Sequence, residues 1–405
     1  MKNKLLFSTI LLHSFLIFSQ SVSRTILLLP DTGQTSSYTS TFGEDHDYSI
    51  NTPAFTNLFN GTIVDNITGL MWQQVDGGEM THENAIIYCD NLVLGGFTDW
   101  RLPTPMESFS IINHQNSNPA INTNYFSSSN TPGAEYWWTS VFENNSTTKV
   151  WCTNSGGGIG NHPKSETISA GGTKRFNVRA VRTLSSPIFM ANHFTDNNDG
   201  TITDNLTQLV WQKIPNPNIF SWEQALVYAE GLTIGTASDW RLPNIKELQS
   251  INNEEATNPS VFSTYFSNLG VHNFWSSTSL PNQTTKAWYW NTQFGITTYD
   301  LKTNTNYVLC VRGNPILASN EFIAQNDIKV FPNPTSNYVL VAFPKEINLV
   351  QIEMSDALGK IVFSKEIKPI SNEFKLDVQG FSEGIYFVNI LHENSKSTFK
   401  IVIKK

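Results

Sequence analysis

The sequence predicts an α+β protein in which one mixed domain occurs twice and is followed by an all-β domain. Three observations support this fold class. The pentapeptide DWRLP stands at residues 99–103 and again at residues 239–243. Around each copy, strand-like alternation is mixed with helical spacing of apolar residues. After residue 326, the strand pattern continues without a helical one.

The match between the two copies extends far beyond the pentapeptide. Three further pairs of segments follow in the same order: residues 61–73 with 200–212, 84–92 with 223–232, and 121–126 with 261–266. Each unit is about 120–130 residues long, which is enough for a core of its own. We therefore expect a tandem duplication rather than a solenoid, whose repeats are much shorter.

Each unit is expected to open with a β-hairpin and to continue with two helices. Thr62–Asp65 and Leu70–Gln73 have the pattern of paired strands, and residues 81–92 and 221–232 have helical spacing. Capping boxes are expected where Ser, Thr or Asn precedes Glu or Gln by three positions: Ser221 with Gln224, Thr104 with Glu107, and Asn244 with Glu247. The last two follow DWRLP directly, so they predict that a second helix begins there.

The pentapeptide itself is interpreted as a corner between a strand and that second helix. Alternate residues of an extended segment share a face, so we expect Trp100 and Leu102 in the core and Asp99 and Arg101 on the other face. Pro103 ends the strand. We expect the Asp–Arg pair to fix the corner; a catalytic pair is the less favoured alternative, because the corner already accounts for every residue.

Composition and the N-terminus predict an exported protein. The chain of 405 residues is 15% charged and 12% aromatic, with a net charge of −8, which favours neither nucleic acid nor an anionic membrane as a partner. Lys2 and Lys4 precede an apolar run at residues 5–18, the pattern of a signal peptide at residues 1–20. No later stretch is expected to span a membrane. LPDTG at residues 29–33 lacks the C-terminal context of a wall-anchoring signal.

The ordered motifs of the two units resemble a known family. GTITDNLTQLVWQ, DWRLPNIKEL, FWSST, AW and CVRG are similar to the Lcl C-terminal domain of a collagen-like bacterial adhesin. The resemblance covers residues 55–184 and 194–313, with a leader at 21–54 and a linker at 185–193. It implies two tandem C-type-lectin-like domains and binding of glycans or other surface polymers, although a fold does not fix a function.

The C-terminal segment has a separate character. Residues 326–405, after a linker at 314–325, show period-two strands broken by Gly, Asn and Pro, which predicts a small Ig-like β-sandwich. Its PNP motif and terminal lysines resemble the type A sorting domain of the type IX secretion system. This resemblance implies the secretion machinery as a partner and a location in the medium or on the outer cell surface.

The three cysteines do not predict a catalytic site. The family resemblance implies one disulfide per domain, between the first helix and the last strand. Here Cys89 faces Ala180, and Ala229 faces Cys310, so each copy has lost one half, while Cys152 is additional. A Cys89–Cys152 bridge is possible, but buried thiols are favoured. An enzyme related to formylglycine-generating enzymes is the least favoured function, and no catalytic residue is predicted.

No metal or cofactor is predicted either. The segment DNNDG at residues 196–200 looks like part of a calcium loop. An EF-type loop that places Gly200 sixth would begin at Thr195 and end at Leu206, neither of which suits calcium. A tight turn is therefore the favoured interpretation.

Aromatic residues that break the match between the copies predict the ligand site. Trp288 and Trp290 share one face of a strand and Tyr289 lies on the other, so we expect one exposed face. Exposed rings beside Asn291 are typical of a sugar platform, with Trp137 as the weaker equivalent. The alternative is that the second face packs on the other repeat. For the function, the alternative to glycan binding is a structural surface or matrix protein that binds only proteins.

Overall fold

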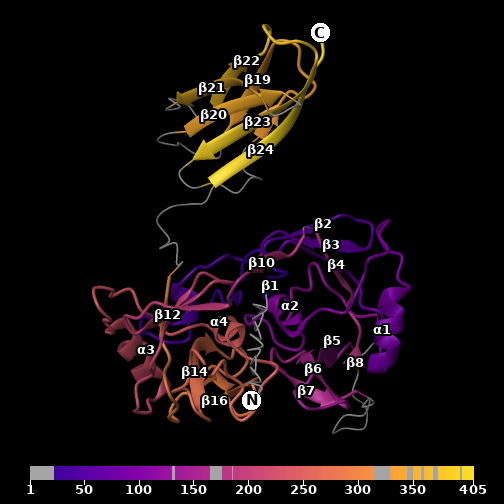
Figure 1. The fold of residues 1–405 in the computed structure, drawn as a ribbon. Helices are drawn as coiled ribbons and strands as arrows, with labels where there is room; N and C mark the ends of the chain where they lie inside the picture. The colour runs from indigo at the N-terminus through magenta and orange to yellow at the C-terminus, as the bar shows by residue number, and fades with distance from the viewer. Residues whose placement is uncertain are drawn as a thin grey trace, which may run out of the picture. The chain divides into compact units, whose positions relative to one another are not determined.

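The computed structural model describes residues 22–129, 133–164, 176–184, 186–313, 329–343, 350–356, 360–367, 373–392 and 395–405. The predicted signal peptide and the linker at 314–325 lie outside these residues. The chain divides into two compact units, Met1–Ala318 and Ser319–Lys405, so both repeats belong to one unit (Figure 1). No helix of the described part is long and apolar enough to cross a membrane.

The described residues of repeat 1 form two helices and eight strands. The strands before the helices are β2 (Phe55–Asn57), β3 (Thr62–Asp65) and β4 (Leu70–Gln73), and the helices are α1 (His82–Asp90) and α2 (Pro105–Ser110). The later strands are β5 (Tyr136–Phe142), β6 (Lys149–Asn154), β7 (Ile159–Pro163), β8 (Phe176–Asn177) and β9 (Val181–Thr183). The predicted hairpin is therefore confirmed.

Repeat 2 has the same order of elements except for β8, where it has only an isolated bridge between Phe274 and Tyr307. Its first strands are β11 (Phe194–Asp196), β12 (Thr201–Asp204) and β13 (Val210–Gln212), and its helices are α3 (Trp222–Glu230) and α4 (Ile245–Ser250). The later strands are β14 (Asn273–Ser279), β15 (Lys286–Asn291), β16 (Ile296–Leu301) and β17 (Val311–Arg312). In both repeats the last strand returns to the first sheet, giving the orders β2-β3-β4-β9 and β11-β12-β13-β17.

The two repeats share one hydrophobic core. Buried residues of both repeats, among them Trp72 and Phe109 of the first and Trp211 and Leu248 of the second, belong to one cluster. Helices α2 and α4 contact each other in the middle of the unit, while α1 and α3 lie at its two sides (Figure 1). Each repeat also has a smaller cluster of its own beneath α1 or α3. The repeats are therefore fused across a joint core.

The DWRLP corner is confirmed in its burial and in the helix that follows it, but the predicted strand and ion pair are wrong. Residues 99–103 form no strand, and only Arg101 makes an isolated bridge, to Val181. Trp100 and Leu102 are buried, and α2 begins with a complete capping box. The expected pairing of Asp99 with Arg101 is wrong. Arg101 forms a two-pronged pair with Glu107 at 2.7 Å for both contacts, and Asp99 accepts from Arg182 on β9 at 2.7 Å.

Repeat 2 has the same pairs. Arg241 contacts Glu247 at 2.7 and 2.6 Å, and Arg312 contacts Asp239 at 2.6 Å. The side chains of Asp and Arg in the pentapeptide share a face, but each finds a partner of opposite charge elsewhere. The two pairs together tie the corner to the new helix and to the last strand.

The second compact unit consists of strands in the part that the structure describes. These are β18 (Lys329–Phe331), β19 (Tyr338–Ala342), β20 (Val350–Asp356), β21 (Ile361–Ile367), β22 (Glu373–Asp377), β23 (Gly384–His392) and β24 (Ser395–Ile403). They form two antiparallel sheets of order β18-β19-β22 and β21-β20-β23-β24. Buried residues of both sheets, such as Val341 and Val388, belong to one cluster.

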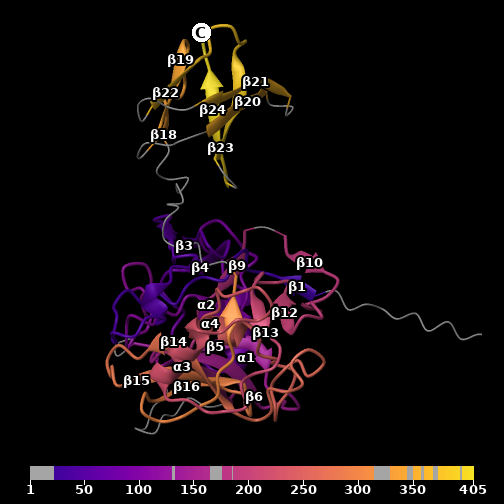
Figure 2. The same ribbon diagram turned by 90° about the vertical axis from the view of Figure 1, so that its left-hand side faces the viewer.

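The segment before repeat 1 is an ordered part of the first unit. Strand β1 (Val22–Arg24) pairs with β10 (Ile188–Met190), which lies between the repeats in sequence (Figure 2). The chain then crosses to repeat 2, where a short 3₁₀ helix, η1 (Asp45–Asp47), contacts β14. Within the predicted leader at 21–54, this part comprises residues 25–51, and from here on the name leader refers to these residues.

Candidate functional site at the repeat junction

The three predicted site tryptophans are buried, so the expectation of an exposed aromatic face is wrong. Trp288 is 3% exposed, Trp290 0% and Trp137 5%. The indole N–H of Trp290 donates to Asn252 Oδ1 at 3.2 Å, and that of Trp137 donates to Asp76 Oδ2 at 3.2 Å. None of these rings is accessible for stacking on a sugar.

Trp288 is buried because repeat 1 covers it. Its ring lies 5.4 Å from the ring of His114, centroid to centroid, in an edge-to-face arrangement. A Cβ atom added to Gly157 would lie 3.2 Å from Trp288 Cζ2, so the glycine permits this close approach. The alternative interpretation, packing against the other repeat, is confirmed for Trp288.

Tyr289 and Asn291 remain partly accessible. Tyr289 lies on the other face of β15, with its ring 6.1 Å from that of Trp275. Asn291 donates to Asn273 Oδ1 at 2.8 Å and accepts from the backbone N–H of Phe294 at 3.1 Å. Asn291 therefore holds the turn that presents Phe294, a residue that is 47% exposed.

This turn forms one wall of a polar cleft of about 320 Å³, which we call the junction cleft. Strands β5, β6 and β7 of repeat 1 supply the opposite wall. The lining side chains include Tyr136, Asn154, Asn161, His162, Phe294 and Thr298. The backbone N–H of Ile159 donates to Thr297 Oγ1 at 3.0 Å, which ties β7 to β16 at the base of the cleft. Amide, hydroxyl and aromatic groups thus surround one hollow.

The described charges around the cleft are balanced. Lys149 and Glu143, which both line it, lie 3.5 Å apart. Elsewhere on repeat 1, Lys164 pairs with Glu83 at 2.8 Å. Arg179 is buried, and it donates to backbone carbonyl oxygens and lies 3.7 Å from Asp76.

Burial lowers the pKa of Arg179 to about 10, and the nearby Asp76 partly offsets this effect. Lys174 and Arg175, the other basic residues of this stretch, lie outside the described residues. Lys164 and Arg179 therefore add no unpaired positive charge to the surface.

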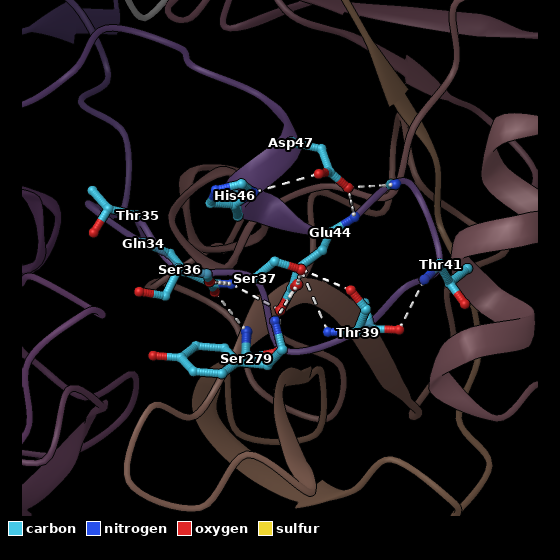
Figure 3. A network of polar contacts seen from close by, with 12 residues as sticks. Gln34, Thr35, Ser36, Ser37, Thr39, Thr41, Glu44, His46, Asp47 and Ser279 are labelled. Carbon is cyan, nitrogen blue, oxygen red and sulfur yellow. Dashed lines mark hydrogen bonds and ion pairs between the residues drawn. The ribbon is translucent and has the colours of Figure 1, made fainter.

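The structure also reveals a role of the leader that the sequence did not predict. Glu44 accepts from Gln34, Ser279, Ser37 and the backbone of Tyr38, at 2.6–2.9 Å (Figure 3). Four donors, three from the leader and one from β14, thus converge on one buried carboxylate. The polar composition of the leader is typical of a linker. Only its concentration of acidic and hydroxyl residues could have indicated that it forms a buried hydrogen-bond network.

A group of buried ionisable residues lies where the leader contacts both repeats. Burial raises the pKa of Asp31 to about 6 and that of Asp45 well above its usual range, and in Asp45 the neighbouring Asp31 adds to the effect. Burial lowers the pKa of Lys246 to about 8 and that of His114 to about 3. The protonation of this group is therefore set mainly by loss of water contact.

The three cysteines are buried thiols, and the DNNDG segment forms a turn. Cys89, Cys152 and Cys310 are buried, and no disulfide forms within the described residues. Burial raises the pKa of Cys89 to about 12 and raises that of Cys310 further. Asp196 accepts from the backbone of Asn198 at 3.0 Å, which confirms the tight turn. No group of three or more His, Cys, Asp or Glu is placed to hold a metal in the part that the structure describes.

Comparison with known protein families agrees with this architecture. The Lcl C-terminal domain matches residues 61–182 and again residues 200–312, and the secretion system C-terminal sorting domain matches residues 329–404. The chain therefore belongs to the Lcl C-terminal domain family and carries a type IX sorting domain, which directs export to the cell surface or the extracellular space. No curated protein matches the chain.

Proposed function

We propose that this exported member of the Lcl C-terminal domain family is an adhesin-like protein that binds a glycan in the junction cleft. One observation carries the proposal: an exposed aromatic ring, Phe294, faces a wall with amide and hydroxyl side chains across a cleft of about 320 Å³. A lectin-like fold of the two repeats, which the family resemblance implies, agrees with this role.

The chemistry of the cleft suits a neutral sugar. The apolar face of a sugar ring can stack on Phe294, while Asn161 and Thr298 bond its hydroxyl groups. The net charge of −8 and the pairing of Lys149 with Glu143 give a sulfated or phosphorylated polymer no reason to bind there. We therefore expect the ligand to be neutral or sparsely charged.

A glycan array with residues 22–405 tests this proposal. We expect saturable binding to at least one neutral glycan and a loss of about 1–3 kcal/mol in the Phe294→Ala variant. Asn161→Ala should also weaken binding, because it removes hydrogen bonds to the sugar. Phe59→Ala is the matched control, since Phe59 is 91% exposed and lies outside the cleft. Binding that survives both cleft substitutions would place the ligand elsewhere.

Binding to proteins alone is the second candidate, and an open groove on repeat 1 favours it, as argued below. We propose no catalytic role. A cysteine nucleophile must reach its thiolate form, whereas burial raises the pKa of Cys89 to about 12.

A further inference from the structure

Repeat 1 has an open groove at a place where repeat 2 is covered. This groove, which we call the repeat-1 groove, has a volume of about 500 Å³. It lies between α1 and the DWRLP corner, and its lining includes Ile86, Cys89, Asp90, Arg101, Leu102 and Ser140. The corresponding residues of repeat 2 are Leu226, Ala229, Glu230, Arg241, Leu242 and Ser277.

The leader covers these residues on repeat 2. The phenol of Tyr48 donates a hydrogen bond to Glu230, and Arg241 lies 5.4 Å from the centroid of the Tyr48 ring. Asp45 accepts from Thr278 at 2.6 Å, and Glu44 accepts from Ser279 at 2.6 Å. The covering residues Glu44, Asp45 and Tyr48 belong to the 3₁₀ helix η1 and its two caps. A short polypeptide segment with a 3₁₀ turn and one tyrosine is therefore the natural occupant of this kind of groove.

The two grooves share the backbone contact that fixes the corner, but the residues around it are covered to different degrees. In repeat 1 the backbone N–H of Ser140 on β5 donates to the carbonyl oxygen of Pro103 at 2.8 Å. In repeat 2 the backbone N–H of Ser277 on β14 donates to that of Pro243 at the same distance. Ser277 is 1% exposed, whereas Ser140 is exposed. The side chain of Arg241 is 2% exposed, whereas that of Arg101 is 36% exposed.

Ile86 shows the same contrast on the helix. It is 40% exposed, while its counterpart Leu226 is fully buried. Next to the groove, Val141 and Phe142 of repeat 1 stand where repeat 2 has Thr278 and Ser279. Phe142 is 39% exposed. If solvent exposure alone decided these two positions, the open repeat would have the hydroxyl side chains and the covered repeat the apolar ones. Instead, the open repeat has Val and Phe, and the covered repeat has Thr and Ser.

We propose that the repeat-1 groove is a docking site for a short polypeptide segment of a partner protein that forms a 3₁₀ turn, as η1 does on repeat 2. The segment carries a tyrosine whose ring lies over Arg101 and whose hydroxyl bonds Asp90. The segment also carries apolar side chains at the positions three and four residues before the tyrosine. These side chains contact Val141 and Phe142. On repeat 2 the corresponding leader residues are Asp45 and Glu44, which accept from Thr278 and Ser279.

The charges of the groove agree with this occupant. Arg101 is held by Glu107, which is fully buried, so the planar guanidinium is fixed with one part exposed to the groove. Such a guanidinium favours an aromatic ring over it. Asp90 is exposed and shares its helix position with Glu230, the acceptor of the Tyr48 phenol.

The leader of a second copy does not meet these requirements. Its Glu44 and Asp45 would face apolar side chains and lose the hydrogen bonds that they form on repeat 2. In this chain the leader is also already bound. The occupant is therefore a different protein, and its site is separate from the junction cleft.

Peptides based on the leader test the proposal. The probe is a labelled peptide of residues 37–50 with Glu44→Leu and Asp45→Val, added to residues 22–405 and followed by fluorescence anisotropy. We expect saturable binding of one peptide per chain. The peptide of natural sequence, and the probe with the additional change Tyr48→Ala, should each bind at least about tenfold more weakly.

Two neighbouring isoleucines of α1 give matched protein variants. Ile86 lines the groove, whereas Ile87 is 57% exposed and does not line it. Ile86→Asp should weaken probe binding at least about tenfold, and Ile87→Asp should change it less than about twofold. Thermal unfolding checks that both variants are folded.

The outcomes separate the two proposals. Phe294→Ala should leave peptide binding unchanged, and Ile86→Asp should leave glycan binding unchanged. Peptide binding that is insensitive to Ile86→Asp would overturn the proposal, because the probe would then occupy another surface, such as the groove of repeat 2 after displacement of the leader. Absence of peptide binding, or loss of glycan binding in Ile86→Asp, would also overturn it.

Discussion

The leader is expected to be bound tightly through Glu44, and the isosteric change Glu44→Gln tests this. Glu44 is fully buried. One carboxylate oxygen accepts from Gln34 at 2.8 Å and Ser279 at 2.6 Å, and the other accepts from Ser37 at 2.9 Å and the backbone of Tyr38 at 2.8 Å (Figure 3). Replacing one oxygen with an NH₂ group keeps the shape but places a donor against donors.

Neither orientation of the new amide resolves this conflict. With nitrogen toward Ser37, the hydroxyl can rotate and accept, but the backbone N–H of Tyr38 cannot. With nitrogen toward Ser279, the hydroxyl can again rotate, but the amide of Gln34 is fixed, because its oxygen accepts from Ser279 N at 2.8 Å and its nitrogen also donates to Ser36 O at 3.1 Å. One buried N–H group therefore always lacks an acceptor.

The expected cost follows from these bonds. An unsatisfied buried donor costs about 1–3 kcal/mol, and each remaining bond to a charged acceptor becomes a neutral one that is weaker by about 1 kcal/mol. Loss of the buried charge offsets part of this sum through a smaller desolvation cost. We expect a net loss of about 3 kcal/mol in the free energy of leader docking.

Hydrogen exchange followed by mass spectrometry measures this loss directly. About 3 kcal/mol corresponds to an increase of roughly two orders of magnitude in the exchange of leader amides that open locally. Glu255→Gln is the control, because Glu255 is exposed. If exchange of residues 37–48 in Glu44→Gln stays within about threefold of the natural protein, the argument from fixed donors is wrong.

Three further predictions concern the core and its ionisation. Trp290→Ala should lower the free energy of unfolding by about 3–5 kcal/mol in a urea titration, because the ring is fully buried; a loss below about 1 kcal/mol would contradict its place in the core. As the pH falls from 6 to 4, Asp31 gains a proton in the folded state but not yet in the unfolded state, so it adds to the free energy of unfolding. His114 stays neutral in the folded state but gains a proton in the unfolded state, so it lowers the free energy of unfolding. Asp31→Asn should therefore make the melting temperature fall more steeply with acid, and His114→Gln less steeply; parallel pH profiles would refute this. Ala180→Cys should form a disulfide with Cys89, since both belong to one buried cluster, and free thiols under oxidising conditions would show that helix and strand are not in register.

Local features of the chain were predictable from the sequence. The strands of the first hairpin and the capping box at Thr104 depend on residues within a few positions of each other. The burial of Trp100 follows from alternation along one extended segment. The repeat itself also fixed which elements recur, because the same motifs appear in the same order.

Contacts between distant segments were not predictable in this way. Trp288 looks like a surface aromatic within its own strand, and only His114 and Gly157 of the other repeat bury it. Asp45 and Thr278 are separated by 233 positions, and nothing in either segment indicates the other. The sequence pattern of a strand shows which residues share a face, but it does not show what covers that face.

Lys246 explains why the junction cleft can be a preformed site. Its ammonium group is fully buried and donates to Asp31 O of the leader at 2.8 Å and to Ser110 O of repeat 1 at 2.7 Å. One side chain of repeat 2 thus binds the leader and the other repeat together, while repeat 1 has Met106 at the equivalent position. Removing either acceptor would leave a buried charge without its partner, so relative motion of the repeats is disfavoured. The two walls of the junction cleft are therefore fixed before a ligand arrives, and binding does not require the entropy loss of bringing them together.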